Sequence, residues 1–130
     1  MPVPEERLRP HPTERFAGAE HLLDLDAALR ALRAEAWPSV SGHRQIALMH
    51  HGPVRLVLFA FHPGGCIKEH SAPGWVTIHA LHGTLQVRTQ DAVHRLTDGM
   101  LLSLAPGAPH DVEAMDEADM LLGVYPEAPR

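Results

Sequence analysis

Histidine is the most abundant side chain in this 130-residue sequence that could bind a metal ion or transfer a proton near neutral pH, with 11 residues. An imidazole ring can bind a metal ion, exchange a proton near neutral pH or hydrogen-bond a polar ligand. Two of these rings stand where a strand-like segment meets a loop: His70 precedes Ser-Ala-Pro-Gly, and His110 follows Ala-Pro-Gly-Ala-Pro. In a small all-β domain, such a position can place a histidine at the mouth of a barrel, where a ligand could bind.

Other reactive side chains add no recognisable catalytic arrangement. Ser71 lies outside any nucleophile-elbow sequence, and Cys66, the single cysteine, has no base matched to it. We expect Glu69 and Glu113, which lie near the two histidines, to be surface charges. Trp75 is either exposed in its loop or a pocket wall. The sequence therefore assigns no catalytic residue.

Strands must position the two histidines. From Gly42 onward, apolar and polar residues tend to alternate, and turn sequences such as Pro-Gly-Gly and Asp-Gly recur at intervals of about 8 to 12 residues. This pattern is typical of a β-sandwich or barrel, and the lack of crossover helices excludes a parallel α/β sheet. The run 54–61 is apolar on both faces, so it needs a second cover, either a helix or another subunit. We expect a homodimer that uses this face.

The segment before the strands divides into an arm and a helix. Residues 1–20 hold four prolines among charges and predict an extended arm that Leu8 and Phe16 could anchor. The rest, 21–130, is expected to be a single domain with its barrel over about 42–125. A helix is predicted over about 24–36, with Asp24 or Asp26 as its N-cap. Its apolar positions are Leu22, Leu25, Leu29, Leu32 and Ala36, and Pro38 is expected to force Trp37 out of helical geometry.

Two segments of the strand region resemble the two sequence motifs of the cupin superfamily. The first has the order Gly64, five residues, His70, one residue, Ala72, three residues, Val76, six residues, Gly83. The second has the order Gly99, five residues, Ala105-Pro106-Gly107, two residues, His110, three residues, Ala114. The resemblance covers roughly residues 45–125. It implies an all-β double-stranded β-helix, the RmlC-like jelly roll, which is usually dimeric and has a pocket inside the barrel.

The resemblance also implies a metal site with four ligand positions. Cupins commonly hold a divalent ion through two histidines and a glutamate or third histidine of the first motif and one histidine of the second. In this sequence the positions are occupied by His70, Ala72, Val76 and His110. The resemblance implies that His70 and His110 converge at the barrel mouth on one small ligand or one metal ion. The alternative is a vestigial site, in which the two rings bond each other, water or the backbone. Ala72 and Val76 have no donor atom, so they can only line a pocket, and this departure argues against a metal ion.

Two further histidines lie on the strand that begins near Val76. If Val76 faces the barrel interior, Ile78 and His82 share its face and His79 points outward, because side chains alternate along a strand. His82 is then too far along the strand to reach the site. His79 is a weak third metal candidate that needs a bulge to reach it.

Composition narrows the partners. The chain is 45% apolar with a formal charge of −5, and its few Arg and Lys residues are scattered, so nucleic acid is not an expected partner. No apolar run approaches the roughly 20 residues needed to cross a bilayer. The N-terminus lacks a signal-peptide core and the single cysteine makes no internal disulfide, so we expect a cytoplasmic protein.

Two classes of function fit these observations. One is a small-molecule-binding cupin with a depleted metal site, whose pocket is carried by His70 and His110. The other is a cupin enzyme of dioxygenase or isomerase type that uses Fe, Mn, Ni or Zn and acts on a small polar substrate. The side chains at Ala72 and Val76 favour the first.

Overall fold

The computed structural model describes residues 18–36 and 39–127, and this part of the chain contains one helix and nine strands. The helix, α2, spans Leu25–Arg33. The strands in chain order are β1 (His43–His51), β2 (Val54–Phe61), β3 (Cys66–His70), β4 (Trp75–His82), β5 (Leu85–Thr89), β6 (Val93–Leu96), β7 (Leu101–Leu104), β8 (His110–Ala114) and β9 (Ala118–Tyr125). The arm predicted over 1–20 lies almost wholly outside the described residues, as do Leu8, Phe16, Trp37 and Pro38.

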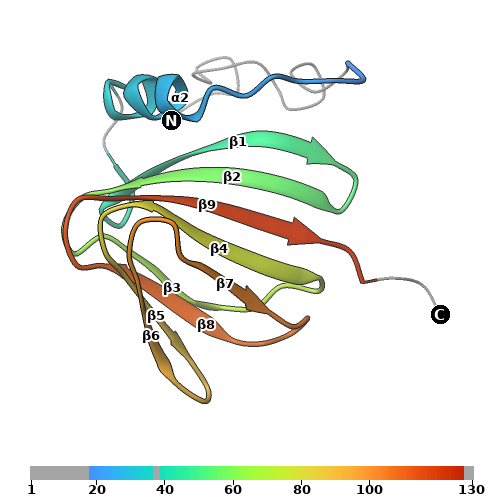
Figure 1. The fold of residues 1–130 in the computed structure, drawn as a ribbon, viewed down its shortest axis with the longest axis vertical. Helices are drawn as coiled ribbons and strands as arrows, with labels where there is room; N and C mark the ends of the chain where they lie inside the picture. The colour runs from blue at the N-terminus through green and yellow to red at the C-terminus, as the bar shows by residue number, and fades with distance from the viewer. Residues whose placement is uncertain (1–17, 37–38, 128–130) are drawn as a thin grey trace, which may run out of the picture.

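The strands form two antiparallel sheets, shown in Figure 1. One sheet has the order β1-β2-β9-β4-β7 and the other has the order β3-β8-β5-β6. After β2 the chain crosses between the sheets at nearly every connection, with the β5–β6 hairpin as the exception. The expected all-β jelly roll is therefore confirmed.

The core lies between the two sheets. Its largest fully buried side chains include Phe61, Ile78, Leu85 and Met120, each 0% exposed. These residues come from four different strands and share the inward-facing positions of their strands, as period-two patterning requires. Burial of this inner face holds the two sheets together.

The antiparallel pairing gives the molecule two distinct ends. At one end, which we call the loop end, lie the hairpin 51–54, the loops 71–74 and 105–109, the hairpin 89–93 and the end of β9. At the other end, the clamp end, lie the short turns at 62–65, 83–84, 97–100 and 115–117.

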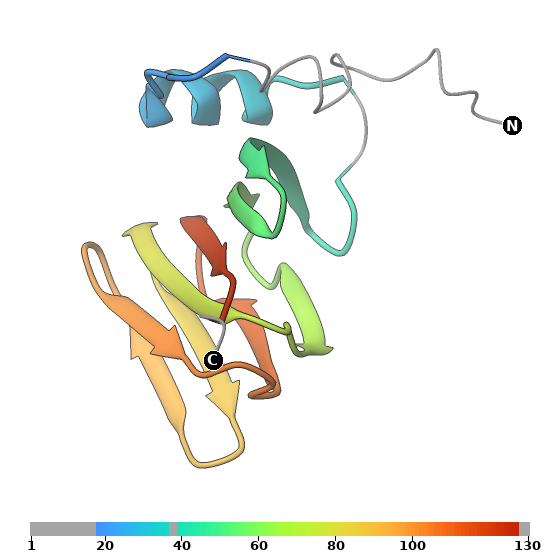
Figure 2. The same ribbon diagram turned by 90° about the vertical axis from the view of Figure 1, so that its right-hand side faces the viewer.

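Helix α2 covers part of the outer face of the five-stranded sheet, as Figures 1 and 2 show. Asp24 is its N-cap, because the carboxylate accepts a hydrogen bond of 3.0 Å from the Ala27 N–H. Leu29 and Leu32 are buried against Leu58 and its neighbours on β1 and β2. In the described ranges, no helix combines the length and the apolar character that a bilayer span needs.

The helix is shorter than the sequence pattern suggested. It ends at Arg33 rather than near residue 36, and Ala34 forms its C-cap. Leu22 was wrongly placed in the buried stripe, because it precedes the helix and is fully exposed.

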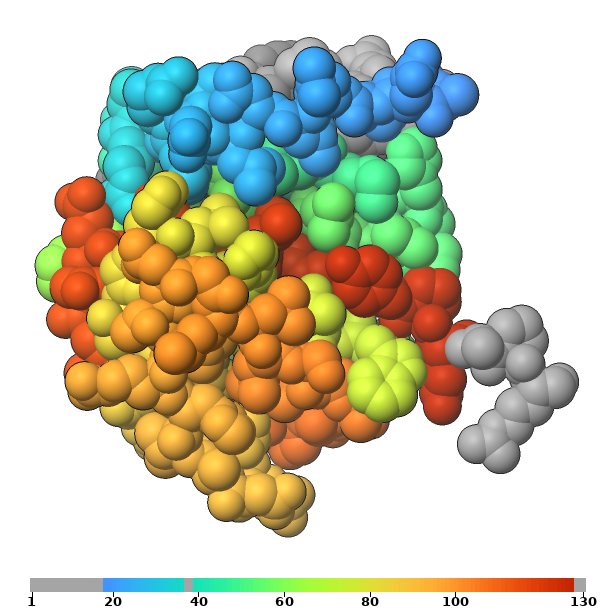
Figure 3. All heavy atoms as spheres, in the orientation of Figure 1, coloured from blue at the N-terminus to red at the C-terminus, as the bar shows by residue number. Residues whose placement is uncertain are grey.

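The second cover expected for the apolar strand at 54–61 is supplied by α2. The helix packs mainly over β1 and β2. In the space-filling view of Figure 3, yellow and orange atoms, the colours of the β4 to β7 region, lie open below the blue atoms of the helix segment. Across this part of the outer face, Leu121, His79 and Leu101 form one row of paired residues. Leu101 is 56% exposed, so an apolar patch remains on this surface.

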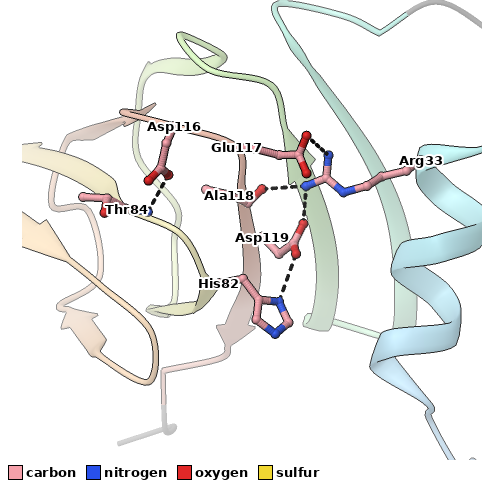
Figure 4. Close-up of polar contacts among 7 residues, drawn as sticks. All are labelled: Arg33, His82, Thr84, Asp116, Glu117, Ala118 and Asp119. Carbon is pink, nitrogen blue, oxygen red and sulfur yellow. Dashed lines mark hydrogen bonds and ion pairs between the residues drawn. The ribbon is translucent and has the colours of Figure 1, made fainter.

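A polar network fixes α2 to the sheet at the clamp end (Figure 4). The Arg33 guanidinium pairs with the Asp119 carboxylate, donates to the Ala118 carbonyl at 3.2 Å and lies 3.9 Å from the Glu117 carboxylate. Asp119 also accepts a hydrogen bond of 3.0 Å from His82. The network explains how a nine-residue helix keeps one position on the sheet.

His82 does not face the barrel interior as predicted. The strand register shifts between Ala80 and His82, so that His82 pairs with Asp119 on the outer face. An extra residue in one strand reverses the direction of the side chains that follow it. The strand then turns at Gly83, which has φ of +80°, and a Cβ there would overlap the Glu117 carbonyl oxygen.

Candidate functional site

His70 and His110 meet at the loop end. His70 is the last residue of β3, His110 is the first residue of β8, and the two are paired across the strands. Their ring centroids are 4.3 Å apart with an interplanar angle of 57°. The two imidazole rings therefore lie beside each other, as the motif spacing predicted.

A bulge in β3 produces this pairing. The register shifts between Ile67, which pairs with Val112, and His70, which pairs with His110. Without the extra residue, Glu69 would lie opposite His110. Glu69 instead is exposed, while Glu113 is half-buried at the other end of β8.

Backbone carbonyls orient both rings. Nδ1 of His70 lies 3.1 Å from the Lys68 carbonyl oxygen, and Nδ1 of His110 lies 3.1 Å from the Ala108 carbonyl oxygen. A carbonyl only accepts, so Nδ1 carries the proton in each ring. A ring in this tautomer presents its Nε2 lone pair as an acceptor.

His110 is kept neutral by its surroundings. Burial of the ring, which is 2% exposed, lowers the pKa of His110 below its ordinary value of 6.5. The hydrogen bond to Ala108 opposes this pKa shift, neighbouring His70 adds to it, and Asp111 weakly opposes it. Neutral His110 can accept a hydrogen bond at pH 7.

Nε2 of His110 is buried and has no hydrogen-bond partner among the described residues. A buried polar atom without a partner costs about 1–3 kcal/mol, so proteins rarely leave one unless something else satisfies it. The other such side-chain atom in the described ranges is Nε of Arg44, which lies on the outer, helix-covered face of the five-stranded sheet. Only the His110 atom lies beside a second imidazole.

The remaining ligand positions of the cupin pattern contain no donor. Ala72 is half-buried against the core and Val76 is 3% exposed within it. His79 shares the outer face with Leu101 and Leu121, so it is not brought to His70 and His110. In the described ranges, no three His, Cys, Asp or Glu side chains are grouped so as to hold a metal ion. Two imidazoles alone do not fit a divalent ion, which usually takes at least three protein ligands in a catalytic site.

Other residues named from the sequence have simpler positions. Of the two positions considered for Trp75, the structure has the exposed one: the residue is 48% exposed and begins β4. Cys66 is a half-buried free thiol and Ser71 is exposed in the loop after His70.

The sequence reasoning missed a second group at the loop end. Arg55 and His50, paired across β1 and β2, line a cavity of about 480 Å³ together with the β3–β4 loop and the end of β9. The signal was present, because Arg55 is the one charge in the apolar run 54–61 and shares the parity of Val57 and Phe59. The apolar character of the run concealed it.

Comparison with solved structures identifies the architecture as that of the cupins. A conserved protein of unknown function from Streptococcus pyogenes matches with a TM-score of 0.68 and 22% identity, over 85% of this chain and 92% of that one. A cupin superfamily protein from Desulfitobacterium hafniense matches with a TM-score of 0.65 and 19% identity, over 70% and 84%. An RmlC-like cupin from Desulfovibrio desulfuricans matches with a TM-score of 0.58 and 25% identity, over 63% and 80%.

The family itself comes from the sequence. Residues 52–122, more than half of the chain, match the model of the AraC-like ligand binding domain. The chain belongs to this family of ligand-binding cupins, which confirms the cupin resemblance. A comparison with curated proteins finds no match.

Proposed function

We propose that the protein binds a small polar molecule at its loop end through His70 and His110, without a resident metal ion. The observation that carries the proposal is the buried Nε2 atom of His110, which no described residue satisfies. A hydroxyl or amine of a ligand would supply the missing hydrogen. Membership of a ligand-binding family supports the same function.

The two rings would act together on the ligand. Their Nδ1 protons are held by backbone carbonyls, so neither ring needs to reorient when the ligand arrives. His70 is exposed and His110 is buried, which places one acceptor at the entrance and one deeper in the site. This arrangement favours a ligand with two neighbouring donor groups.

A divalent-metal enzyme is the less well supported alternative. Its support is the pair of oriented Nε2 lone pairs, and the chemistry against it is the absence of donors at Ala72 and Val76. Elemental analysis of untagged protein discriminates the two. Near-stoichiometric metal that is lost in a His70→Ala, His110→Ala double variant would overturn the metal-free proposal.

The binding test uses a library of small polar metabolites and the full chain. Compounds that raise the melting temperature are measured by calorimetry against wild type and His110→Gln. We expect the variant to bind about 10-fold or more weakly, because one hydrogen bond in a buried site is lost. His62→Gln is the matched control, since His62 is exposed at the clamp end. Equal affinity of His110→Gln and wild type would contradict the assignment.

We also propose that the uncovered part of the five-stranded sheet forms a homodimer interface. In the row Leu121, His79 and Leu101, Leu121 packs against the cluster under α2, whereas Leu101 lies outside that cluster and is 56% exposed. Light scattering after size-exclusion chromatography at micromolar concentration should give the mass of a dimer, and Leu101→Glu should give a monomer. A wild-type monomer under these conditions would refute the interface.

A further inference from the structure

The cavity at the loop end has the size and lining of a small-molecule site. Its volume is about 480 Å³, and its wall includes Arg55, His50, Val124, Pro73 and Glu127. Small ligands usually bind in pockets of about 300 to 1,000 Å³ with apolar walls and a few polar groups. Arg55 is the only arginine or lysine in this wall.

The register of the sheet places Arg55 on the inner face. Arg55 pairs with Val124, and Val124 pairs in turn with Val76. Directly paired residues point to the same face of a sheet, and both valines are buried in the core. Arg55 itself is exposed, unlike its two partners in this row. Two strand spacings, about 10 Å, separate its backbone from that of Val76, one of the empty ligand positions.

Arg55 is unpaired, unlike the arginine at the clamp end. Among the described residues the side chain of Arg55 makes no hydrogen bond or ion pair, whereas that of Arg33 contacts Asp119, Glu117 and the Ala118 carbonyl. Glu127 lines the same cavity, but no ion pair joins it to Arg55, so the guanidinium is left to solvent or to a ligand. A planar guanidinium in a concave, partly apolar site is suited to a bidentate pair with a carboxylate.

We propose that the ligand bound at the loop end is a small monocarboxylic acid whose carboxylate pairs with Arg55. The inference rests on the proposed function, because it names the chemical class of the ligand that the same end of the barrel binds. The cavity wall includes neither His70 nor His110, so the ligand would have to extend from Arg55 to the two rings. Pro73 and Val124 supply an apolar wall for the body of the acid. Glu127 lies in the same wall, so a second carboxylate on the ligand would meet a like charge.

The test compares acids with their neutral amides. Lactate, benzoate and glucuronate are titrated into the full chain by calorimetry alongside lactamide, benzamide and glucuronamide. We expect at least one acid to bind at millimolar concentration or below and its amide to bind at least about 10-fold more weakly. Arg55→Met should weaken that acid by roughly 10- to 100-fold, the range of a charge-assisted hydrogen bond.

Controls separate this inference from the proposed function. Arg95→Met is matched, because Arg95 is an exposed arginine on β6 that faces away from the core. It should bind the acid as wild type does, and circular dichroism checks the fold of each variant. If His110→Gln weakens binding and Arg55→Met does not, the proposed function stands and the carboxylate assignment is overturned. If only Arg55→Met weakens it, the carboxylate assignment stands and the histidine pocket is wrong. Failure of all three acids to bind, or equal binding of acid and amide, overturns the inference.

Discussion

The clamp end and the loop end of the barrel treat their polar groups in opposite ways. At the clamp end, Asp119 accepts from both Arg33 and His82, and the Asp116 carboxylate accepts from the Thr84 N–H at 2.8 Å (Figure 4). At the loop end, Nε2 of His110 and the guanidinium of Arg55 have no partner among the described residues. Paired polar groups stabilise a fold, whereas a buried polar atom without a partner, such as Nε2 of His110, costs stability. Arg55 is exposed, so solvent hydrates its charge and leaving it unpaired costs the fold little. The contrast therefore distinguishes a structural end from a functional one.

The largest effect is expected from breaking the clamp. Asp119→Ala removes the acceptor that Arg33 and His82 share, and the Asp119 side chain is only 12% exposed. We expect the free energy of unfolding in urea to fall by about 2–3 kcal/mol. Asp91→Ala, in the exposed β5–β6 turn, is the control and should change it by less than about 0.5 kcal/mol. A loss in Asp119→Ala no larger than in the control would show that the clamp is not structural.

A smaller effect is expected from acid at the loop end. Since burial lowers the pKa of His110, the folded protein binds a proton at this ring less readily than the unfolded chain does. The contribution of neutral His110 to the free energy of unfolding is therefore complete above about pH 6.5, and it is lost as the pH falls through the lowered pKa. Urea unfolding of wild type and His110→Leu between pH 8 and pH 5 should show the steeper loss in wild type. The other histidines are common to both proteins, so parallel curves would contradict the pKa shift.

The same protonation should weaken ligand binding. A proton on Nε2 of His110 turns an acceptor into a donor, so the hydroxyl or amine of a ligand loses its partner. Stability should be lost as the pH falls from about 6.5 to the lowered pKa of folded His110, whereas ligand binding, measured by calorimetry over the same series, should be lost only below that pKa. Binding that falls already at pH 6.5 and above would contradict the assignment to this ring.

The sequence predicted the architecture well because the relevant signals are local. Turn sequences and motif spacing were enough to infer the jelly roll and to bring His70 and His110 together. The two bulges were beyond that reasoning, since neither the register shift before His70 nor the one before His82 is marked by a glycine. A bulge is selected by packing across the sheet, and a single residue of shift reverses a side chain. His82 was placed on the wrong face for this reason, and the pairing of His70 rather than Glu69 with His110 has the same origin.

Arg55 shows a different limit. Its position in an apolar strand was visible in the sequence. Whether it lines a cavity depends on its partners across the sheet, His50 on β1 and Val124 on β9, and Val124 is remote in the sequence. Charge in an apolar run indicates a special environment only when the pairing is known. The structure supplied that pairing, and with it the second polar group of the loop end.

The smallest effect separates the two arginines directly. Arg33→Met should lower the free energy of unfolding by about 1–2 kcal/mol, because Asp119 loses a charged partner in a mostly buried position. Arg55→Met should change it by less than about 0.5 kcal/mol, because Arg55 is exposed and stabilises no other described group. Both are measured in urea at pH 7.5 without ligand. If the two variants lose equal stability, Arg55 is a structural residue and the contrast between the ends fails. If Arg55→Met is neutral and also loses carboxylate binding, its positive charge has been kept for the ligand alone.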